Sequence, residues 1–218
     1  MTPFLERLAA VPLVAILRAA GAGRFLEVGR VLYEAGVRGI EVTLTSEGAL
    51  EAFGRLREEL PGDALLGVGT VRSVADAELA VAAGAGYLVA PDLRPEVVGW
   101  AVERGLPVVP GALTPTEVAR AARRCSVVKL FPASLGGPAL LRALRGPFPT
   151  LAVVPTGGVT AADLRDWVAA GALAVGAGTD LCPPDAVERG DSRALEAGAA
   201  RYMASFAAAR DGVAAPGA

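Results

Sequence analysis

One lysine stands alone in this chain. It is Lys129, within the apolar run SVVKLFPAS at residues 126–134, and every other basic side chain is an arginine. Apolar surroundings disfavour a charged amine, and a neutral primary amine can attack a ketone or an aldehyde to form a Schiff base. The guanidinium of arginine stays protonated and cannot take this role. We therefore interpret Lys129 as a nucleophile, rather than as a lysine that reaches solvent or pairs with a buried acid.

Glu41 is the second candidate for chemistry. In the run GIEVTL, at residues 39–44, the alternation of a strand places Glu41, Thr43 and the following Thr45 on one face and apolar residues on the other. A carboxylate inside a strand needs a partner, and Lys129 is the natural one. Glu41 could then move protons during imine chemistry. The alternative is an acid that only holds an arginine or a helix N-terminus.

Two glycine-rich runs, PTGGV at residues 155–159 and GAGTD at residues 176–180, each precede a helical segment. Backbone N–H groups in such loops, with a helix N-terminus behind them, bind phosphate. A third run, GVGTV at residues 67–71, brings Thr70, whose hydroxyl could hold a small carboxylate. Each run alone is weak evidence, but together they favour an anionic substrate.

The composition excludes several classes of protein. The 218 residues are 53% hydrophobic and carry a formal net charge of −2, without the basic excess of a nucleic-acid-binding protein. The chain has no histidine, which removes His-based catalysis and most zinc sites, so we expect neither a metal nor a cofactor. The apolar runs are too short to cross a bilayer, and the first residues do not resemble a signal peptide. Because Cys125 and Cys182 have no motif spacing, we expect a reduced, cytoplasmic protein.

Short apolar runs rich in β-branched residues alternate with longer segments of helical periodicity. The expected strands cover residues 12–18, 39–44, 65–71, 87–91, 107–112, 126–132, 151–158 and 173–179. Several of the helical segments end in a glycine that suits a helix C-terminus, namely Gly36, Gly84, Gly105 and Gly171. Several begin at a residue that suits the N-cap, namely Ser46, Ser73, Thr114 and Thr160.

Eight strand–helix units predict an α/β fold with a parallel sheet, specifically a single (β/α)8 TIM barrel. The alternative, an open doubly wound sheet, is disfavoured because no GxGxxG follows the first strand. We expect one domain over residues 1–210 and a disordered tail over residues 211–218. Catalytic groups of such barrels lie at the carboxyl ends of the strands. These ends present Arg18, Glu41, Thr43, Thr45, Gly69, Thr70, Pro91, Pro110, Gly111, Lys129, Phe131, Thr156, Gly157, Gly158, Gly178 and Thr179.

The motifs EVTL, GVGTV, VKLFPAS, PTGGV and GAGTDL, with PG in the fifth strand, resemble those of the KDPG/KHG aldolase family in order and spacing. These enzymes act on 2-keto-3-deoxy-6-phosphogluconate (KDPG) and 4-hydroxy-2-oxoglutarate (KHG). The resemblance extends from about residue 10 to 205 and implies a class I aldolase on a (β/α)8 barrel, assembled as a homotrimer. It implies the following roles: Lys129 for the Schiff base, Glu41 for proton transfer, Thr70 for the pyruvate carboxylate, Phe131 and Pro91 for the pocket around the imine, and Thr156, Gly157, Gly158, Gly178 and Thr179 for the phosphate.

The chain departs from the family at one position. Well-known members have an arginine directly after EVTL, where this chain has Thr45. That arginine contacts the anionic part of the substrate, and Arg18 at the end of the first strand could supply the missing cation. The run GAGTDL is closer to relatives that act on the galactonate analogue (KDPGal), so the stereochemistry at C4 stays open.

The expected reaction is reversible cleavage of KDPG to pyruvate and glyceraldehyde 3-phosphate, with cleavage of KHG to pyruvate and glyoxylate as a further activity. A KDPGal aldolase is one alternative. A phosphosugar isomerase or epimerase on the same barrel is another, and it would not need an amine nucleophile. A third is a barrel that only binds phosphometabolites.

Overall fold

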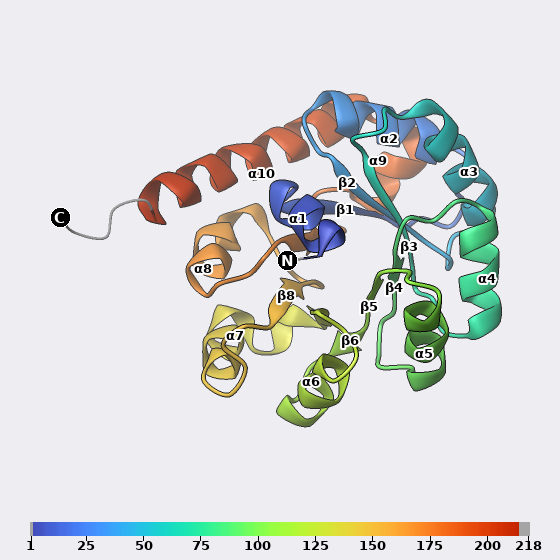
Figure 1. The fold of residues 1–218 in the computed structure, drawn as a ribbon. Helices are drawn as coiled ribbons and strands as arrows, with labels where there is room; N and C mark the ends of the chain where they lie inside the picture. Colours follow the sequence, from blue (N-terminus) through green and yellow to red (C-terminus); the bar gives the residue numbers. More distant parts are fainter. Residues whose placement is uncertain (1, 214–218) are drawn as a thin grey trace.

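The computed structural model describes residues 2–213 and shows parallel strands curled into a barrel with helices around it (Figure 1). Each strand lies within one of the apolar runs expected from the sequence, and its residues are buried except for half-buried Ala152. Continuous burial is typical of parallel strands covered on both faces. The strands are β1 (Leu13–Leu17), β2 (Gly39–Thr43), β3 (Leu65–Gly69), β4 (Leu88–Val89), β5 (Val108–Val109), β6 (Gly111–Ala112), β7 (Val127–Leu130), β8 (Ala152–Pro155) and β9 (Val175–Ala177).

The strands form two sheets, in the orders β5-β4-β3-β2-β1-β9 and β6-β7-β8. Strands β5 and β6 both belong to the single run expected at residues 107–112, which Pro110 interrupts because proline has no backbone N–H to donate. The carbonyl of Pro110 accepts a 2.9 Å hydrogen bond from the backbone N–H of Lys129, and Thr156, directly after β8, pairs with Gly176 of β9. The two sheets are therefore joined to each other at both edges. This closure confirms the (β/α)8 barrel over the open doubly wound sheet.

Helices cover the outside of the barrel between successive strands (Figure 1). They are α2 (Phe25–Glu34), α3 (Ala49–Glu59), α4 (Val74–Ala82), α5 (Pro95–Glu103), α6 (Pro115–Ala122), α7 (Gly137–Arg145), α8 (Leu164–Ala169), α9 (Pro184–Arg189) and α10 (Ser192–Val213), with short 3-10 turns η1 (Ala133–Leu135) and η2 (Ala161–Asp163). No helix within residues 2–213 combines the length and apolar character needed to cross a membrane.

Most of the expected helix ends are confirmed. The four glycines expected at C-termini all have φ between +64° and +95°, which glycine adopts without strain. Ser73 accepts a hydrogen bond from the backbone of Asp76, and Thr114 forms a capping box. Thr160 caps the 3-10 turn η2 rather than an α-helix. The expectation for Ser46 is wrong: α3 follows Gly48, and the Ser46 hydroxyl instead accepts a hydrogen bond from the backbone N–H of Ala19.

A helix that the sequence pattern did not reveal lies across one end of the barrel. Helix α1 (Pro3–Ala10) occupies the centre of Figure 1, in front of the strands. Its buried Leu5 and Leu8 belong to an apolar cluster with residues near the starts of the strands, among them Val14 and Tyr87. Helix α1 therefore closes the amino-terminal end of the barrel and leaves the carboxyl ends of the strands open.

Helix α10 packs along α8 and α2 on the outside of the barrel. Its Tyr202 is fully buried and donates a 2.9 Å hydrogen bond from its hydroxyl to the carbonyl of Val159, in the segment after β8. The helix is described as far as Val213. The rest of the expected tail, residues 214–218, lies outside the described residues.

Replacing Tyr202 by phenylalanine should lower the free energy of unfolding by about 1–3 kcal/mol, because the buried carbonyl of Val159 loses its donor. Urea denaturation of the two proteins measures this difference. Tyr33→Phe is a matched control, since the Tyr33 hydroxyl bonds to the exposed Asp63 and its loss leaves no buried group unpaired. Equal effects of the two changes would contradict the role of Tyr202.

Candidate active site

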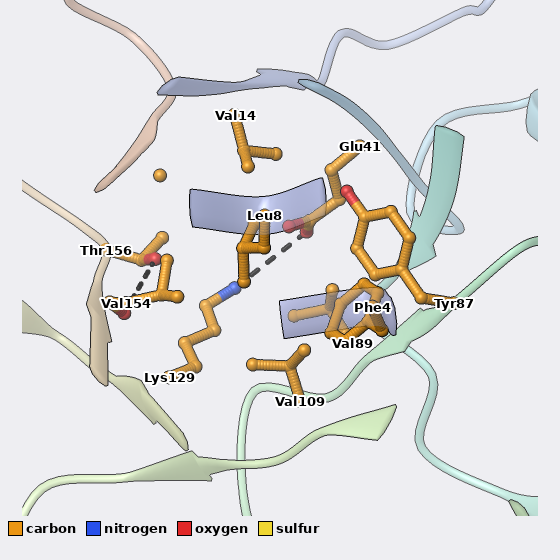
Figure 2. A pocket seen from close by; sticks show the side chains of 11 residues that line it. Phe4, Leu8, Val14, Glu41, Tyr87, Val89, Val109, Lys129, Val154 and Thr156 are labelled. Atoms are coloured by element: carbon orange, nitrogen blue, oxygen red, sulfur yellow. Dashed lines mark hydrogen bonds and ion pairs between the residues drawn. The ribbon is translucent and has the colours of Figure 1, made fainter. Parts of the chain in front are cut away.

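Lys129 and Glu41 face each other in the interior of the barrel (Figure 2). Lys129 lies on β7 and Glu41 on β2, and Nζ of Lys129 is 3.8 Å from Oε1 of Glu41. Lys129 is 6% exposed and Glu41 is 4% exposed, so little water screens the pair. Loss of either partner would leave the other charge buried without compensation. The structure thus brings together the two residues that the sequence pattern paired.

Two glycines of β3 provide the space for this arrangement. Gly67 is the register partner of Glu41, so both face the barrel interior, and Gly69 faces inward two residues further on. A Cβ atom on Gly69 would overlap the Glu41 carboxylate, and one on Gly67 would overlap the ring of Tyr87. The two glycines of the motif GVGTV are therefore required for packing at the site, and the same motif also places Thr70.

A small cavity of about 20 Å³ adjoins the ion pair on the side of the closed barrel end. Its walls are mostly apolar, and its polar side chains are those of Glu41, Lys129, Tyr87 and Thr156. The full lining is Phe4, Leu8, Val14, Glu41, Tyr87, Val89, Val109, Lys129, Val154, Thr156 and Gly176. Such surroundings strengthen the attraction between the amine and the carboxylate.

The other expected site residues become more exposed toward the open end of the barrel. Thr156 is buried with Lys129 and Glu41. Thr70, Pro91, Phe131, Gly157 and Gly178 are half-buried, and Arg18, Thr45, Gly158 and Thr179 are exposed. Exposure therefore increases from the buried amine toward solvent at the open end, where the glycine-rich loops lie.

Thr70 and Arg18 are joined at the ends of β3 and β1. One Nη of Arg18 donates a 3.4 Å hydrogen bond to the Thr70 hydroxyl. Thr70 has φ +63°, and within residues 2–213 it is the only residue other than glycine with a positive φ. This conformation is an outlier for a β-branched side chain, and such outliers cluster at functional sites. The hydroxyl of Thr45 instead donates to that of Thr43, over 3.2 Å.

Phe131 lies between the amine and the first glycine loop. Nζ of Lys129 is 5.1 Å from the centre of the Phe131 ring, and a Cβ atom on Gly157 would be 3.0 Å from that ring. Gly157 and Gly158 have φ of +86° and +79°, so a side chain at either position would be strained.

The two glycine-rich loops are tied to each other. Thr156 pairs with Gly176, where a Cβ atom would be 2.5 Å from the Thr156 hydroxyl. Asp180, in the second loop, accepts a 3.3 Å hydrogen bond from the backbone N–H of Ala161 after the first loop. The structure therefore brings the two runs expected to bind phosphate into one surface.

Tyr87 is the site residue that sequence reasoning missed. Its position at the start of an apolar run suggested only a core residue. The available signal was its alternation with Val89, which puts both side chains on the inner face of the barrel.

Cys182 is not part of the cavity lining, and burial raises the pKa of its thiol to about 12. Among residues 2–213 no cluster of three or more Cys, Asp or Glu is arranged to hold a metal ion.

Comparison with known proteins identifies the family. The family model described as KDPG and KHG aldolase matches residues 5–197. The 2-dehydro-3-deoxy-phosphogluconate aldolase of Treponema pallidum (strain Nichols) is 38% identical over 189 residues, which are 86% of this chain and 88% of that protein. A probable 2-dehydro-3-deoxy-6-phosphogalactonate aldolase of Rhizobium meliloti (strain 1021) is 34% identical over 193 residues, covering 88% of this chain and 89% of that protein.

A solved structure agrees with these relatives. It is the KDPG aldolase of Legionella pneumophila, with pyruvate captured at low pH as a covalent carbinolamine intermediate, and it matches with a TM-score of 0.84. The two sequences are 25% identical, and the match covers 91% of this chain and 97% of the other. With its buried lysine and carboxylate at the centre of the same barrel, the chain belongs to the KDPG and KHG aldolase family and is a class I aldolase, a carbon–carbon lyase.

Proposed function

We propose that this enzyme reversibly cleaves KDPG to pyruvate and glyceraldehyde 3-phosphate, with Lys129 forming the Schiff base and Glu41 moving protons. The observation that carries the proposal is the position of the only lysine, buried in an apolar barrel interior 3.8 Å from one carboxylate. A lysine kept for charge alone would be far less costly at the surface, where the amine could stay hydrated.

Each step of the reaction uses these two groups. Lys129 gives a proton to Glu41, and its neutral amine attacks C2 of the substrate. The carbonyl oxygen takes a proton from the attacking nitrogen to give a carbinolamine. Glu41 returns its proton to the departing hydroxyl, which leaves as water, and a protonated imine remains. The imine accepts the electrons of the C3–C4 bond as the C4 hydroxyl gives its proton to Glu41, and the aldehyde is released. The resulting enamine takes that proton from Glu41 at C3, and water hydrolyses the imine to free pyruvate and Lys129.

The residues around the pair fit the ends of this substrate. The Thr70 hydroxyl and the Arg18 guanidinium are hydrogen-bonded to each other, and together they suit the carboxylate next to C2. Phe131, beside the amine, and Pro91 suit the walls of the pocket around the imine. The joined loops with Thr156, Gly157, Gly158, Gly178 and Thr179 suit the phosphate through their backbone N–H groups.

The choice among related substrates rests on Thr45 and Arg18. The exposed Thr45 is bonded to Thr43 and offers no cation, so Arg18 is the group that replaces the family arginine. KHG lacks the phosphate and would leave the glycine loops without a ligand, which makes it the secondary substrate. KDPGal differs from KDPG at C4 and is the alternative that the run GAGTDL favours.

Assembly as a homotrimer and a cytoplasmic location stay predictions. The exposed apolar side chains of Leu79 and Val81 on α4 and Val102 on α5 would suit a subunit interface, since these two helices lie against each other.

Replacing Lys129 by arginine should lower kcat at least about 10³-fold with KDPG, KDPGal and KHG alike, because the nucleophile of every step is lost. The release of pyruvate from the three substrates measures kcat and the substrate preference in one experiment. Arg55→Lys is the control, since Arg55 is exposed on α3 and its exchange should leave turnover unchanged. Substantial turnover by the Lys129→Arg variant would exclude the Schiff-base role.

Replacing Glu41 by glutamine keeps the shape of the side chain but removes the proton carrier. We expect kcat to fall about 10²–10⁴-fold, the usual range for a general acid or base, in a protein that still folds but has a lower Tm, since the amine of Lys129 loses its charged partner. Steady-state kinetics and thermal unfolding measure the two properties. Glu51→Gln, at an exposed position of α3, serves for comparison. If Glu41→Gln kept nearly full activity, another group would have to carry the proton.

A further inference from the structure

Tyr87 places a buried phenol beside the ion pair, at the residue that precedes β4. Its side chain is 2% exposed. Its ring lies over Gly67, which has no side chain to displace it, and packs on the ring of Phe4 with 5.2 Å between the centres. The ring is thus fixed on two sides, and its hydroxyl lies beside the Glu41 side chain (Figure 2).

Two polar atoms at this place have no hydrogen-bond partner within the described part of the chain. They are the hydroxyl oxygen of Tyr87 and Oε1 of Glu41. The 3.8 Å separation of Oε1 from Nζ of Lys129 is longer than a hydrogen bond. Buried polar groups without partners are rare in folded proteins because they lose their hydration without a replacement, so a bridging group is expected here.

The cavity that Tyr87 and Glu41 help to line has room for one water molecule. Its volume of about 20 Å³ exceeds the roughly 10–15 Å³ needed to hold a water. A water needs two to four polar partners, and the cavity offers Glu41, Tyr87 and Lys129. The Thr156 hydroxyl, also in the lining, already donates to the carbonyl of Val154.

We propose that one bound water joins the Tyr87 hydroxyl to Oε1 of Glu41, and that Tyr87 thereby acts as a positioning residue for the proton carrier. The inference rests on the proposed role of Glu41. Tyr87 donates to the water and the water donates to the carboxylate, so the orientation of the Glu41 carboxylate is fixed from the closed end of the barrel. The reacting atoms of the substrate approach from the open end.

The electrostatic surroundings agree with this direction of donation. Desolvation by burial, and then the negative charge of Glu41, raise the pKa of Tyr87 well above its usual value, so the phenol keeps its proton. The titratable groups that face Glu41 across the cavity are Lys129, from β7, and Tyr87 itself. The lining residues from α1, β1, β4 and β5 are apolar, and those from β8 and β9 are valine, threonine and glycine.

The test is the kinetics of a partial reaction, the exchange of the methyl protons of pyruvate with solvent deuterium. This reaction needs the imine and the proton carrier, and pyruvate has no phosphate to engage the glycine-rich loops. In Tyr87→Phe the kcat of exchange should fall about 3–10-fold while KM for pyruvate stays unchanged, since the Glu41 carboxylate loses the bridge that fixes its orientation. Borohydride trapping of pyruvate on Lys129 should persist.

Tyr202→Phe is the matched control because it removes another buried phenol hydroxyl, one that bonds to Val159 outside the cavity. Its kcat and KM for the exchange should match those of the unmodified enzyme. An unchanged kcat in Tyr87→Phe would overturn the positioning role, and a high-resolution crystal structure without a water between the two side chains would overturn the bridge. Failure of the underlying function looks different: Glu41→Gln would then exchange pyruvate protons at nearly the normal rate.

Discussion

The structure depends on keeping a primary amine and a carboxylate together where almost no water reaches them. Lys129 and Glu41 come from strands on opposite parts of the barrel, and each is nearly fully buried. Burial alone would disfavour both charges, and their attraction over 3.8 Å offsets part of that cost. This balance holds a primary amine beside a carboxylate, the two groups that the proposed reaction uses.

The rest of the barrel maintains this balance. The inward positions of β3 are glycines, so the carboxylate and the Tyr87 ring have room. Helix α1 closes the end of the barrel behind them with Phe4 and Leu8, which keeps bulk water from that side. The open end is bordered by polar and glycine residues that suit an anionic substrate, and α10 holds the segment after β8 through Tyr202. The closed end thus suits stability and the open end suits the proposed recognition of substrate, the division expected of such barrels.

Most of the strands, and the pairing of Lys129 with Glu41, could be predicted because burial and alternation leave a clear signal in sequence. Helix α1 could not, because its eight residues carry too short an apolar pattern to distinguish a helix from a loop. The failure at Ser46 has a similar origin: a serine hydroxyl suits an N-cap or a neighbouring loop equally well, and only the approach of Ala19 decides. Tyr87 was missed because the sequence does not show which inward side chain meets which across a barrel.

The most direct test of the account is borohydride reduction in the presence of pyruvate, read by intact mass and peptide mapping. The chain has one lysine, so the only competing amine is the N-terminus. The account predicts one pyruvyl adduct on the peptide that contains Lys129, and none on the exposed lysine of a Lys129→Arg/Arg55→Lys double variant. An unmodified Lys129, under conditions that label another class I aldolase, would contradict the central role of the buried amine.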